Sequence, residues 1–199
     1  MDGLKGKIVG FYHIIPRSVR SFLTTALVFA LAWKLAYLCF LINPRVLDRP
    51  LTEHVGSSTA YALNHFSGLH GFNAINRLDT NIIEGQMQMT QVSKIIHQGH
   101  KVFHIADGCN GLELMVLYVG FIFSFPASTA RKVGYILMGL LLIDCLNILR
   151  CSLLGFIKEY YHPYFNISHH FIFKAIVYTV IVILWVQFTK TSACYESTS

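Results

Sequence analysis

Charged residues are scarce in this sequence of 199 residues. Lys, Arg, Asp and Glu make up only 13% of it, whereas 54% of its residues are hydrophobic. An average soluble domain is about 25% charged, so this sequence has too few charges to cover a water-facing surface. Its hydrophobic content also excludes an intrinsically disordered chain. The composition therefore indicates a membrane protein, and the length predicts a single transmembrane domain over residues 1–199.

Paired cysteines are also missing. The five cysteines form an odd count and include no C-x-x-C pair, so neither a disulfide framework nor a thioredoxin-like redox site is indicated. Three of them, Cys39, Cys145 and Cys151, fall in apolar stretches. A small buried hydrophobe is the expected role there.

Long apolar runs are plentiful, and four of them are long enough to cross a bilayer as helices, which takes about 17 to 25 residues. They cover residues 22–42, 109–125, 133–157 and 171–188. Polar residues interrupt the weaker run Leu51–Phe66, which is expected to form an amphipathic surface helix, with an additional span as the alternative. The sequence therefore predicts an all-α integral membrane protein with about four transmembrane helices.

Basic residues indicate the orientation, because Lys and Arg gather in cytoplasmic flanks. They occur in the N-terminal tail, in the short loop with Arg131 and Lys132, and in the C-terminal tail. With four spans, all three places lie on the same side. Both termini are therefore expected in the cytoplasm, and residues 43–108 form an extracytoplasmic loop.

Part of that long loop has a strand pattern. Apolar and polar side chains alternate within Thr80–Asp107, which is typical of a strand with one buried face. Asn81 and Gly99 are the candidate turn positions. We expect a small β-hairpin on the outer face of the membrane.

Cys109 differs from the other cysteines. It follows a predicted strand and a turn, and it begins the second apolar run. The positive end of a helix dipole favours a thiolate at such a position, and free N–H groups there are suited to an oxyanion. Cys109 is therefore a candidate nucleophile, with a structural residue at a helix cap as the alternative.

Arg150 is the second candidate. It lies within the third apolar run, about 10 Å below the outer end at 1.5 Å per helical residue. An Arg at this depth is costly unless it faces a partner or a water-filled cavity; the alternative is snorkelling to the outer headgroups. Glu113 lies one turn after Cys109 and is expected to hold Arg150 toward the thiol, unless the two form a purely structural ion pair.

Further polar residues share one face of the third run. Asp144, Asn147 and Cys151 follow one another at helical steps of three and four. Asp144 lies near mid-membrane and is expected to be protonated or paired with Lys34 of the first run. Asn147 is expected to serve hydrogen bonding between helices rather than chemistry.

His169 and His170 open the last apolar run, also on the outer side. A His is a general base or acid near neutral pH. Together with Cys109 and Arg150, a His completes the parts of an acyl-transfer site: a base, a nucleophile and a fixed cation.

Another three histidines have a spacing that suggests a metal site: His97, His100 and His104. No neighbouring carboxylate or Cys completes that site, and there is no H-E-x-x-H motif. We expect an exposed polar loop there, and the sequence predicts neither a metal nor a cofactor.

The candidate residues occur in an order that resembles the exosortase/archaeosortase family. That family has a Cys-Ser-Gly-hydrophobic motif, then Asn-x-x-Arg, then a His followed by an acidic residue. This sequence has GCNGL over Gly108–Leu112, NILR over Asn147–Arg150, and His169 at the head of the last apolar run. Arg150 follows Cys109 by 41 residues, which fits the spacing of the family.

The resemblance implies a membrane cysteine protease or transpeptidase that processes the C-terminal sorting signals of exported proteins. Such a signal consists of a short motif, an apolar helix and a basic tail. Cys109 is then the nucleophile, Arg150 the essential arginine and His169 the third catalytic residue, with His170 as the alternative.

The same resemblance implies a location and partners. The location is the bacterial cytoplasmic (inner) membrane, with the site on the extracytoplasmic side toward the cell envelope. The partners are exported substrate proteins, membrane lipid and a lipid-linked acceptor; nucleic acid is not expected.

Three positions depart from the family pattern. Asn110 replaces the usual Ser, Glu113 stands where a polar or basic residue is common, and His170 replaces the acidic neighbour of the His. These residues and Asn147 are expected to support the site or to contact the substrate. The other function left open is a non-enzymatic membrane assembly factor or small transporter subunit with a buried polar network.

Overall fold

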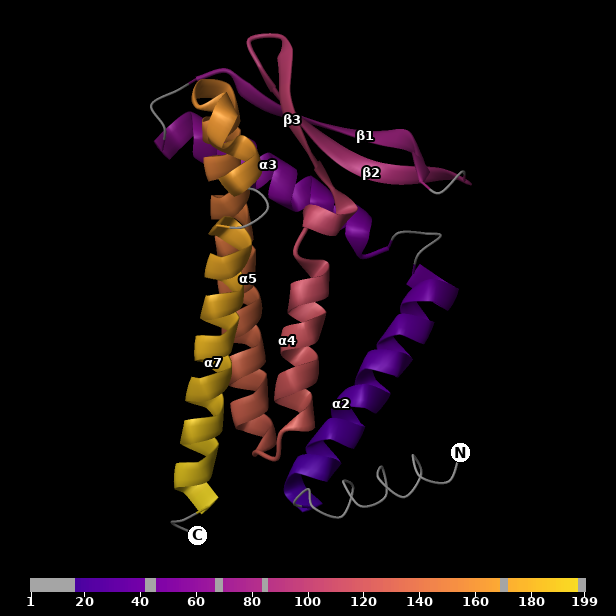
Figure 1. Cartoon of the computed structure of the whole chain (residues 1–199), viewed down its shortest axis with the longest axis vertical. Helices are drawn as coiled ribbons and strands as arrows, with labels where there is room; N and C mark the ends of the chain where they lie inside the picture. The colour runs from indigo at the N-terminus through magenta and orange to yellow at the C-terminus, as the bar shows by residue number, and fades with distance from the viewer. Residues whose placement is uncertain (1–16, 42–45, 67–69, 84–85, 169–171, 197–199) are drawn as a thin grey trace, which may run out of the picture.

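The computed structural model describes residues 17–41, 46–66, 70–83, 86–168 and 172–196. Long helices run lengthwise, and a sheet together with one crossing helix covers one of their ends as a cap (Figure 1). The lengthwise helices are α2 (Arg17–Ala36), α4 (Leu112–Ser124), α5 (Thr129–Tyr160) and α7 (Phe173–Glu196). The cap consists of α3 (Asp48–Phe66), β1 (Phe72–Ile83), β2 (Gln86–His97) and β3 (His100–Ala106). Short helical turns cover Tyr37–Leu41, Asp107–Cys109, His162–Tyr164 and α6 (Phe165–Ile167).

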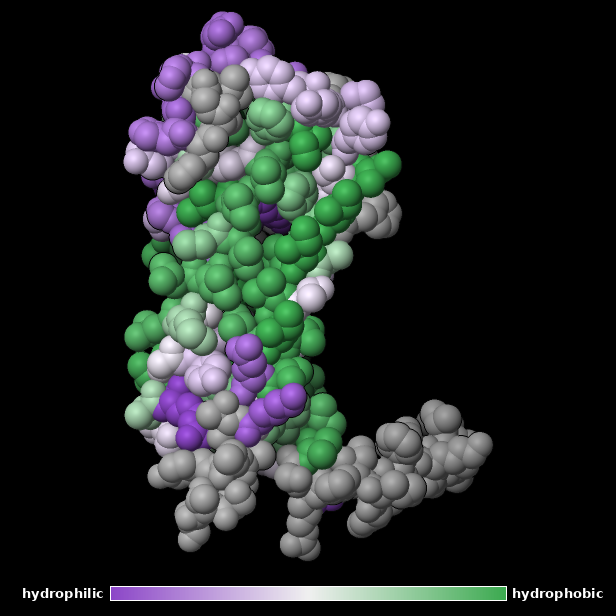
Figure 2. Space-filling view, turned by 90° about the vertical axis from the view of Figure 1, so that its left-hand side faces the viewer, coloured by the Kyte–Doolittle hydropathy of each residue, from purple (hydrophilic) through white to green (hydrophobic). Residues whose placement is uncertain are grey.

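The surface of the lengthwise helices is apolar. Figure 2 shows hydrophobic residues over the middle of the molecule and hydrophilic residues toward both ends. Two segments are long and apolar enough to cross a membrane, Val19–Cys39 and Thr129–Tyr160. Leu112–Ser124 and Ala175–Lys190 are shorter apolar helices. Two of the four predicted spans therefore meet the length requirement, and the four-span arrangement stays a prediction.

Helices α4, α5 and α7 share one apolar core. Tyr118 and Ile122 of α4 pack there with Ile143 of α5 and with Ile181 of α7, and all four are buried. The close approach of α4 and α5 depends on Gly139, because a Cβ at that position would overlap the Tyr118 ring. The three helices are thus fixed side by side, with α4 and α5 joined by the turn between them.

The cap has a second core between α3, the sheet and α5. Val55 and Leu63 of α3 pack with Ile95 of β2, Ile105 of β3 and Cys151 of α5. The predicted helix over Leu51–Phe66 is therefore present within α3. It crosses the ends of the lengthwise helices (Figure 1) and buries one face against the sheet.

The sheet is larger than the predicted hairpin. Its three antiparallel strands have the order β1-β2-β3. The turn at Gly99 is confirmed: Gln98 and Gly99 join β2 to β3 with φ angles of 48° and 85°. The turn at Asn81 is wrong, because Asn81 lies within β1 and pairs with Gln88. The pairing of β1 with β2 continues through that position as far as Ile83 and Gln86, so Asn81 does not mark the strand end.

Candidate active site

Cys109 lies on a short 3-10 turn, Asp107–Cys109, that links β3 to α4. The prediction that Cys109 begins the helix is wrong, because α4 begins only at Leu112. Gly111 separates the turn from the helix with a left-handed φ of 87°. The Leu112 N–H donates to Asn110 Oδ1 at 2.9 Å, so this donor is already used. Cys109 itself is half-buried.

Two side chains of α5 hold the backbone of Cys109. Arg150 Nη2 donates to the Cys109 carbonyl oxygen at 2.9 Å, and Asn147 Nδ2 donates to the same oxygen at 3.1 Å. Arg150 therefore points to the Cys109 turn and does not snorkel. The pairing of Arg150 with Glu113 is wrong, since Glu113 is exposed and no ion pair joins these two described residues.

Arg150 also keeps a spare donor. Its Nε is buried and has no hydrogen-bond partner within the described ranges of the chain. A buried N–H without an acceptor is costly, so this group is suited to an acceptor that arrives with a substrate. The guanidinium thus combines an anchor on the Cys109 backbone with a buried Nε–H that has no acceptor among the described residues.

Asn110 holds the turn from the other side. Its side chain is 1% exposed. Its Nδ2 donates to Asp48 Oδ1 at 3.1 Å and to Thr52 Oγ1 at 3.3 Å, and both acceptors belong to α3. Thr52 Oγ1 in turn donates to Asp107 Oδ1 at 3.0 Å, and Tyr37 donates to Asp48 Oδ2 at 2.6 Å. The Cys109 turn is therefore held between α3 and α5.

Sequence reasoning missed the two α3 residues, Asp48 and Thr52. An Asp in the first turn of a helix is commonly placed there by the helix dipole, so Asp48 carried no sign of contact with a distant turn. Asn110 itself was recognised, but only as a departure from the family motif.

Asp144 has a different partner from the one predicted. Its Oδ2 lies 2.9 Å from His54 Nε2 of α3. The Asp144–Lys34 pair is wrong, because α3 crosses next to α5 whereas α2 lies beyond α4 (Figure 1). Lys34 instead lines a cavity between α2 and α4.

That cavity has a volume of about 600 Å³. Aromatic side chains such as Trp33 and Phe121 line it along the helices, while Gly108, Asn110 and Glu113 line it beside the Cys109 turn. Volumes of this order are typical of ligand sites. The cavity therefore extends from the apolar side chains of α2 and α4 to the polar turn that carries Cys109.

The comparison with protein families reports a match to the transmembrane exosortases over residues 5–186. The chain belongs to the transmembrane exosortase family. The comparison with curated proteins gives no match, and the comparison with solved structures gives none either. As a member of this family, the chain is a membrane protein, and the match includes Cys109, Arg150 and His169.

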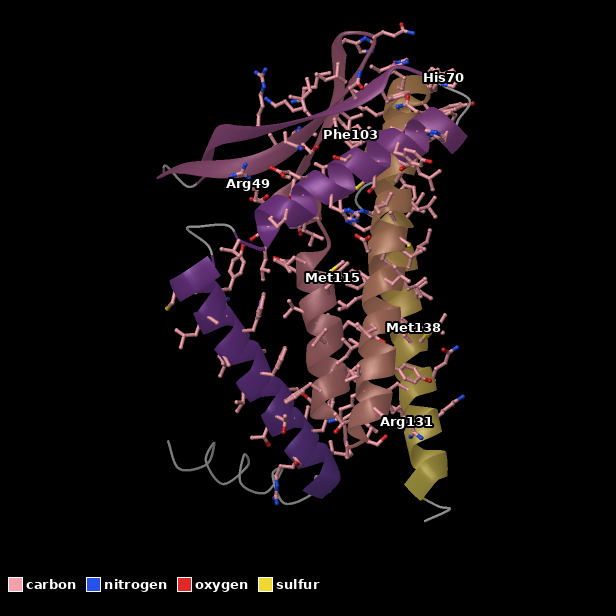
Figure 3. The ribbon with its side chains drawn as sticks, turned by 180° about the vertical axis from the view of Figure 1, so that it is seen from behind. Arg49, His70, Phe103, Met115, Arg131 and Met138 are labelled. Carbon is pink, nitrogen blue, oxygen red and sulfur yellow. The ribbon has the colours of Figure 1, made fainter. Side chains whose placement is uncertain are left out.

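Polar groups lie at both ends of the lengthwise helices (Figure 2), and those of the cap surround the Cys109 end. Figure 3 shows nitrogen and oxygen atoms concentrated at the level of α3 and the sheet, where Arg49 and His70 are labelled. Phe103 of β3 reaches α5 there, because a Cβ at Gly155 would lie 2.7 Å from its ring. Arg131 marks the opposite end of the helices (Figure 3).

The predicted third catalytic residue, His169, and its alternative, His170, lie outside the described residues. Their place relative to Cys109 therefore stays a prediction. The structure brings together Cys109, Arg150, Asn147 and Asn110. The predicted supporting residue Glu113 lines the neighbouring cavity instead of contacting Arg150.

Proposed function

We propose that the chain is an intramembrane cysteine protease or transpeptidase that cleaves the C-terminal sorting signal of exported proteins. The observation that supports this most is the Arg150 guanidinium. It lies 2.9 Å from the Cys109 carbonyl oxygen and keeps a buried Nε without a partner among the described residues. A half-buried thiol whose backbone is held by a cation with a spare N–H supplies two parts of an acyl-transfer site, the nucleophile and the oxyanion donor.

In the proposed reaction, the Cys109 sulfur attacks the carbonyl carbon of the scissile peptide, and His169 accepts the thiol proton. The guanidinium of Arg150 stabilises the negative charge on the carbonyl oxygen. His169 then donates the proton to the leaving amine as the C–N bond breaks. The resulting thioester is resolved by water, an amine or a lipid-linked acceptor. His170 is the alternative for the base.

The proposed substrate follows from the cavity between α2 and α4. The apolar helix of a sorting signal would lie along Trp33 and Phe121, and its short motif would reach the Cys109 turn past Gly108. Helix α2 leaves room for this, since none of its apolar window is buried. An apolar helix at membrane depth is a partner whose own backbone groups are already satisfied.

We also propose that the site faces outward from the cytoplasmic membrane. The basic loop with Arg131 and Lys132 lies at the end of α4 and α5 away from the cap (Figure 3). Short basic loops stay in the cytoplasm, so the cap with Cys109 lies on the extracytoplasmic side.

The decisive test is the variant Cys109→Ala in cells that also express an exported reporter with a tripartite C-terminal signal from the same genome. Processing is followed by the size of the reporter on a gel. Loss of a nucleophile is expected to reduce processing by at least about a thousandfold. The matched control is Cys145→Ala, because Cys145 is exposed on α5, and it should process normally. Full processing by Cys109→Ala would overturn the assignment.

The non-enzymatic alternative is separated by thiol labelling. A membrane-impermeant maleimide added from outside should react with Cys109 faster than with Cys39 and Cys145 if Cys109 is an activated nucleophile. A structural role for the same network predicts slow labelling of Cys109. It also predicts a functional protein after Cys109→Ala and a misfolded one after Arg150→Ala.

A further inference from the structure

The cap contains a second cluster of chemically active side chains, away from the Cys109 turn. His97 Nδ1 lies 2.9 Å from Glu159 Oε1, and His100 Nε2 lies 3.2 Å from the same oxygen. One ligand atom from each residue falls within 4.8 Å of the others. The carboxylate that the neighbouring sequence lacks is thus supplied by the last turn of α5, 62 residues beyond His97.

We propose that His97, His100 and Glu159 bind a divalent transition metal. Zn²⁺ is the ion that this set of two imidazoles and one carboxylate favours. Imidazole nitrogen and carboxylate oxygen are usual Zn²⁺ ligands, held about 2.0 to 2.2 Å from the metal. Two such ligands at a tetrahedral angle lie about 3.3 Å apart. The two measured separations from Glu159 Oε1 lie close to that value, and water would occupy the fourth position.

The hairpin holds both imidazoles in place before a metal arrives. Gln98 and Gly99 form a tight two-residue turn with left-handed φ angles, and this turn places His97 directly opposite His100 in the ladder. The ring of His97 stacks on Phe72 with centroids 4.1 Å apart and planes within 7°. Stacking fixes the orientation of a ligand ring, which is how surrounding groups tune a metal site.

Exposure of the cluster is graded. The side chain of His97 is 7% exposed and that of Glu159 is 17% exposed, whereas that of His100 is 58% exposed. Two ligands are therefore held within the cap, and the third borders the solvent, from which an ion can arrive. His104, the third member of the predicted His spacing, is exposed on β3 and does not belong to the cluster.

The bound ion would join β2, β3 and α5 at one point. Strand β3 runs directly into the Asp107–Cys109 turn, so a metal that fastens the start of β3 to α5 steadies the strand from which Cys109 projects. The proposed metal is a clamp for the cap and takes no part in the attack on the substrate. The alternative is a metal-free cluster in which both imidazoles donate hydrogen bonds to Glu159.

The test uses the full chain, purified in detergent with an affinity tag free of His and stripped with a chelator. Zn²⁺ is added, the excess is removed by gel filtration, and bound metal is measured by mass spectrometry. We expect the unchanged protein to retain one Zn²⁺ per chain more than the ligand variants His100→Ala and Glu159→Gln retain. His100→Ala and Glu159→Gln should each weaken binding at least about tenfold, whereas the matched control His104→Ala should bind like the unchanged protein.

Thiols also bind Zn²⁺, but all these variants keep the same five cysteines, so only the difference between them reports the proposed site. A second readout is the unfolding temperature, which Zn²⁺ should raise in the unchanged protein and in His104→Ala but not in His100→Ala. Equal Zn²⁺ content in the unchanged protein and both ligand variants would overturn the proposal and leave the hydrogen-bonded cluster. Because Cys109→Ala is expected to bind the same extra ion, the result does not depend on the proposed peptidase activity.

Discussion

Among its contacts with the cap, helix α5 holds two points at which a tight turn has left-handed backbone. At the first, Asn147 and Arg150 donate hydrogen bonds to the carbonyl of Cys109, beside Gly111 with its φ of 87°. At the second, Glu159 contacts the two histidines on either side of the Gln98–Gly99 turn. The same helix thus fixes two turns of one cap.

The two points differ in chemistry. At the Cys109 turn the acceptor is a backbone carbonyl, and neither an Asn amide nor an Arg guanidinium changes charge in the physiological range. At the hairpin, a carboxylate oxygen contacts two imidazole rings, so side chains hold side chains. The first point therefore fixes the backbone that carries Cys109, and the second fastens the hairpin through three side chains that are also the proposed metal ligands.

Among changes to the two α5 contact points, the largest expected effect comes from removing the Arg150 anchor. Arg150→Ala deletes both the bond to the Cys109 carbonyl and the proposed oxyanion donor, and processing should fall by about 10² to 10³. Arg150→Lys should not restore it, because an ammonium cannot present two donors in the planar arrangement of a guanidinium. The reporter assay measures both variants, and an Arg150→Lys variant of normal activity would refute the donor role.

Replacing the glycines of the two turns compares them directly. Gly111→Ala strains a backbone with φ of 87° and places a Cβ 3.3 Å from Asn147 Nδ2, whereas Gly99→Ala has φ of 85° and meets nothing within 4 Å. Left-handed backbone costs an L-residue about 1 to 2 kcal/mol, so both variants should lose that much stability in urea unfolding.

Only Gly111→Ala adds a steric contact with the Asn147 side chain, which holds the Cys109 carbonyl. It should therefore be the less stable of the two and should lose processing activity, while Gly99→Ala keeps it. Equal activity of the two variants would mean that the position of Asn147 does not matter to the Cys109 turn.

A smaller effect is expected from Asn110→Ser, which introduces the residue usual in the family motif. A Ser hydroxyl can still accept the Leu112 N–H, but it is too short to reach Asp48 and Thr52 together. Loss of these buried bonds should cost about 1 to 3 kcal/mol, measured by thermal unfolding in detergent. Processing should stay within about tenfold, since the contacts of Arg150 remain. An unchanged unfolding temperature would show that the α3 contacts contribute nothing.

The sequence could reveal Cys109 and Arg150 because both are conspicuous locally. Arg150 is a charge deep in an apolar run, and Cys109 is a thiol that follows a predicted strand and turn. Both features need an explanation whatever fold the chain adopts. The contact of Arg150 with the Cys109 carbonyl was not predictable. It depends on Cys109 lying in a 3-10 turn before α4, whereas the sequence predicted that Cys109 begins the helix. The wrong Asp144–Lys34 pair has a related cause: hydropathy indicates depth in the membrane but not which helices are neighbours.

Contacts between distant segments explain the remaining errors. No local feature of the sequence singles out Asp48 or Glu159, because the partners of both at these turns lie about 60 residues away along the chain. The strand alternation predicted a hairpin but did not predict where β1 ends, so Asn81 was taken for a turn. Period-two patterns identify strands and faces, whereas turn positions depend on backbone angles that Asn tolerates without requiring them.

The smallest expected effect comes from loosening the hairpin point alone. Without added metal, Glu159→Gln keeps a carbonyl oxygen for the imidazoles and loses only the charge, so the loss of stability should be about 1 kcal/mol. Processing should be unchanged, because the Arg150 and Asn147 bonds to the Cys109 carbonyl are separate from this cluster. Reporter cleavage in cells and urea unfolding of the purified variant measure the two outcomes. A large loss of cleavage with little loss of stability would show that the two points on α5 are coupled, and that the hairpin acts on the nucleophile through β3.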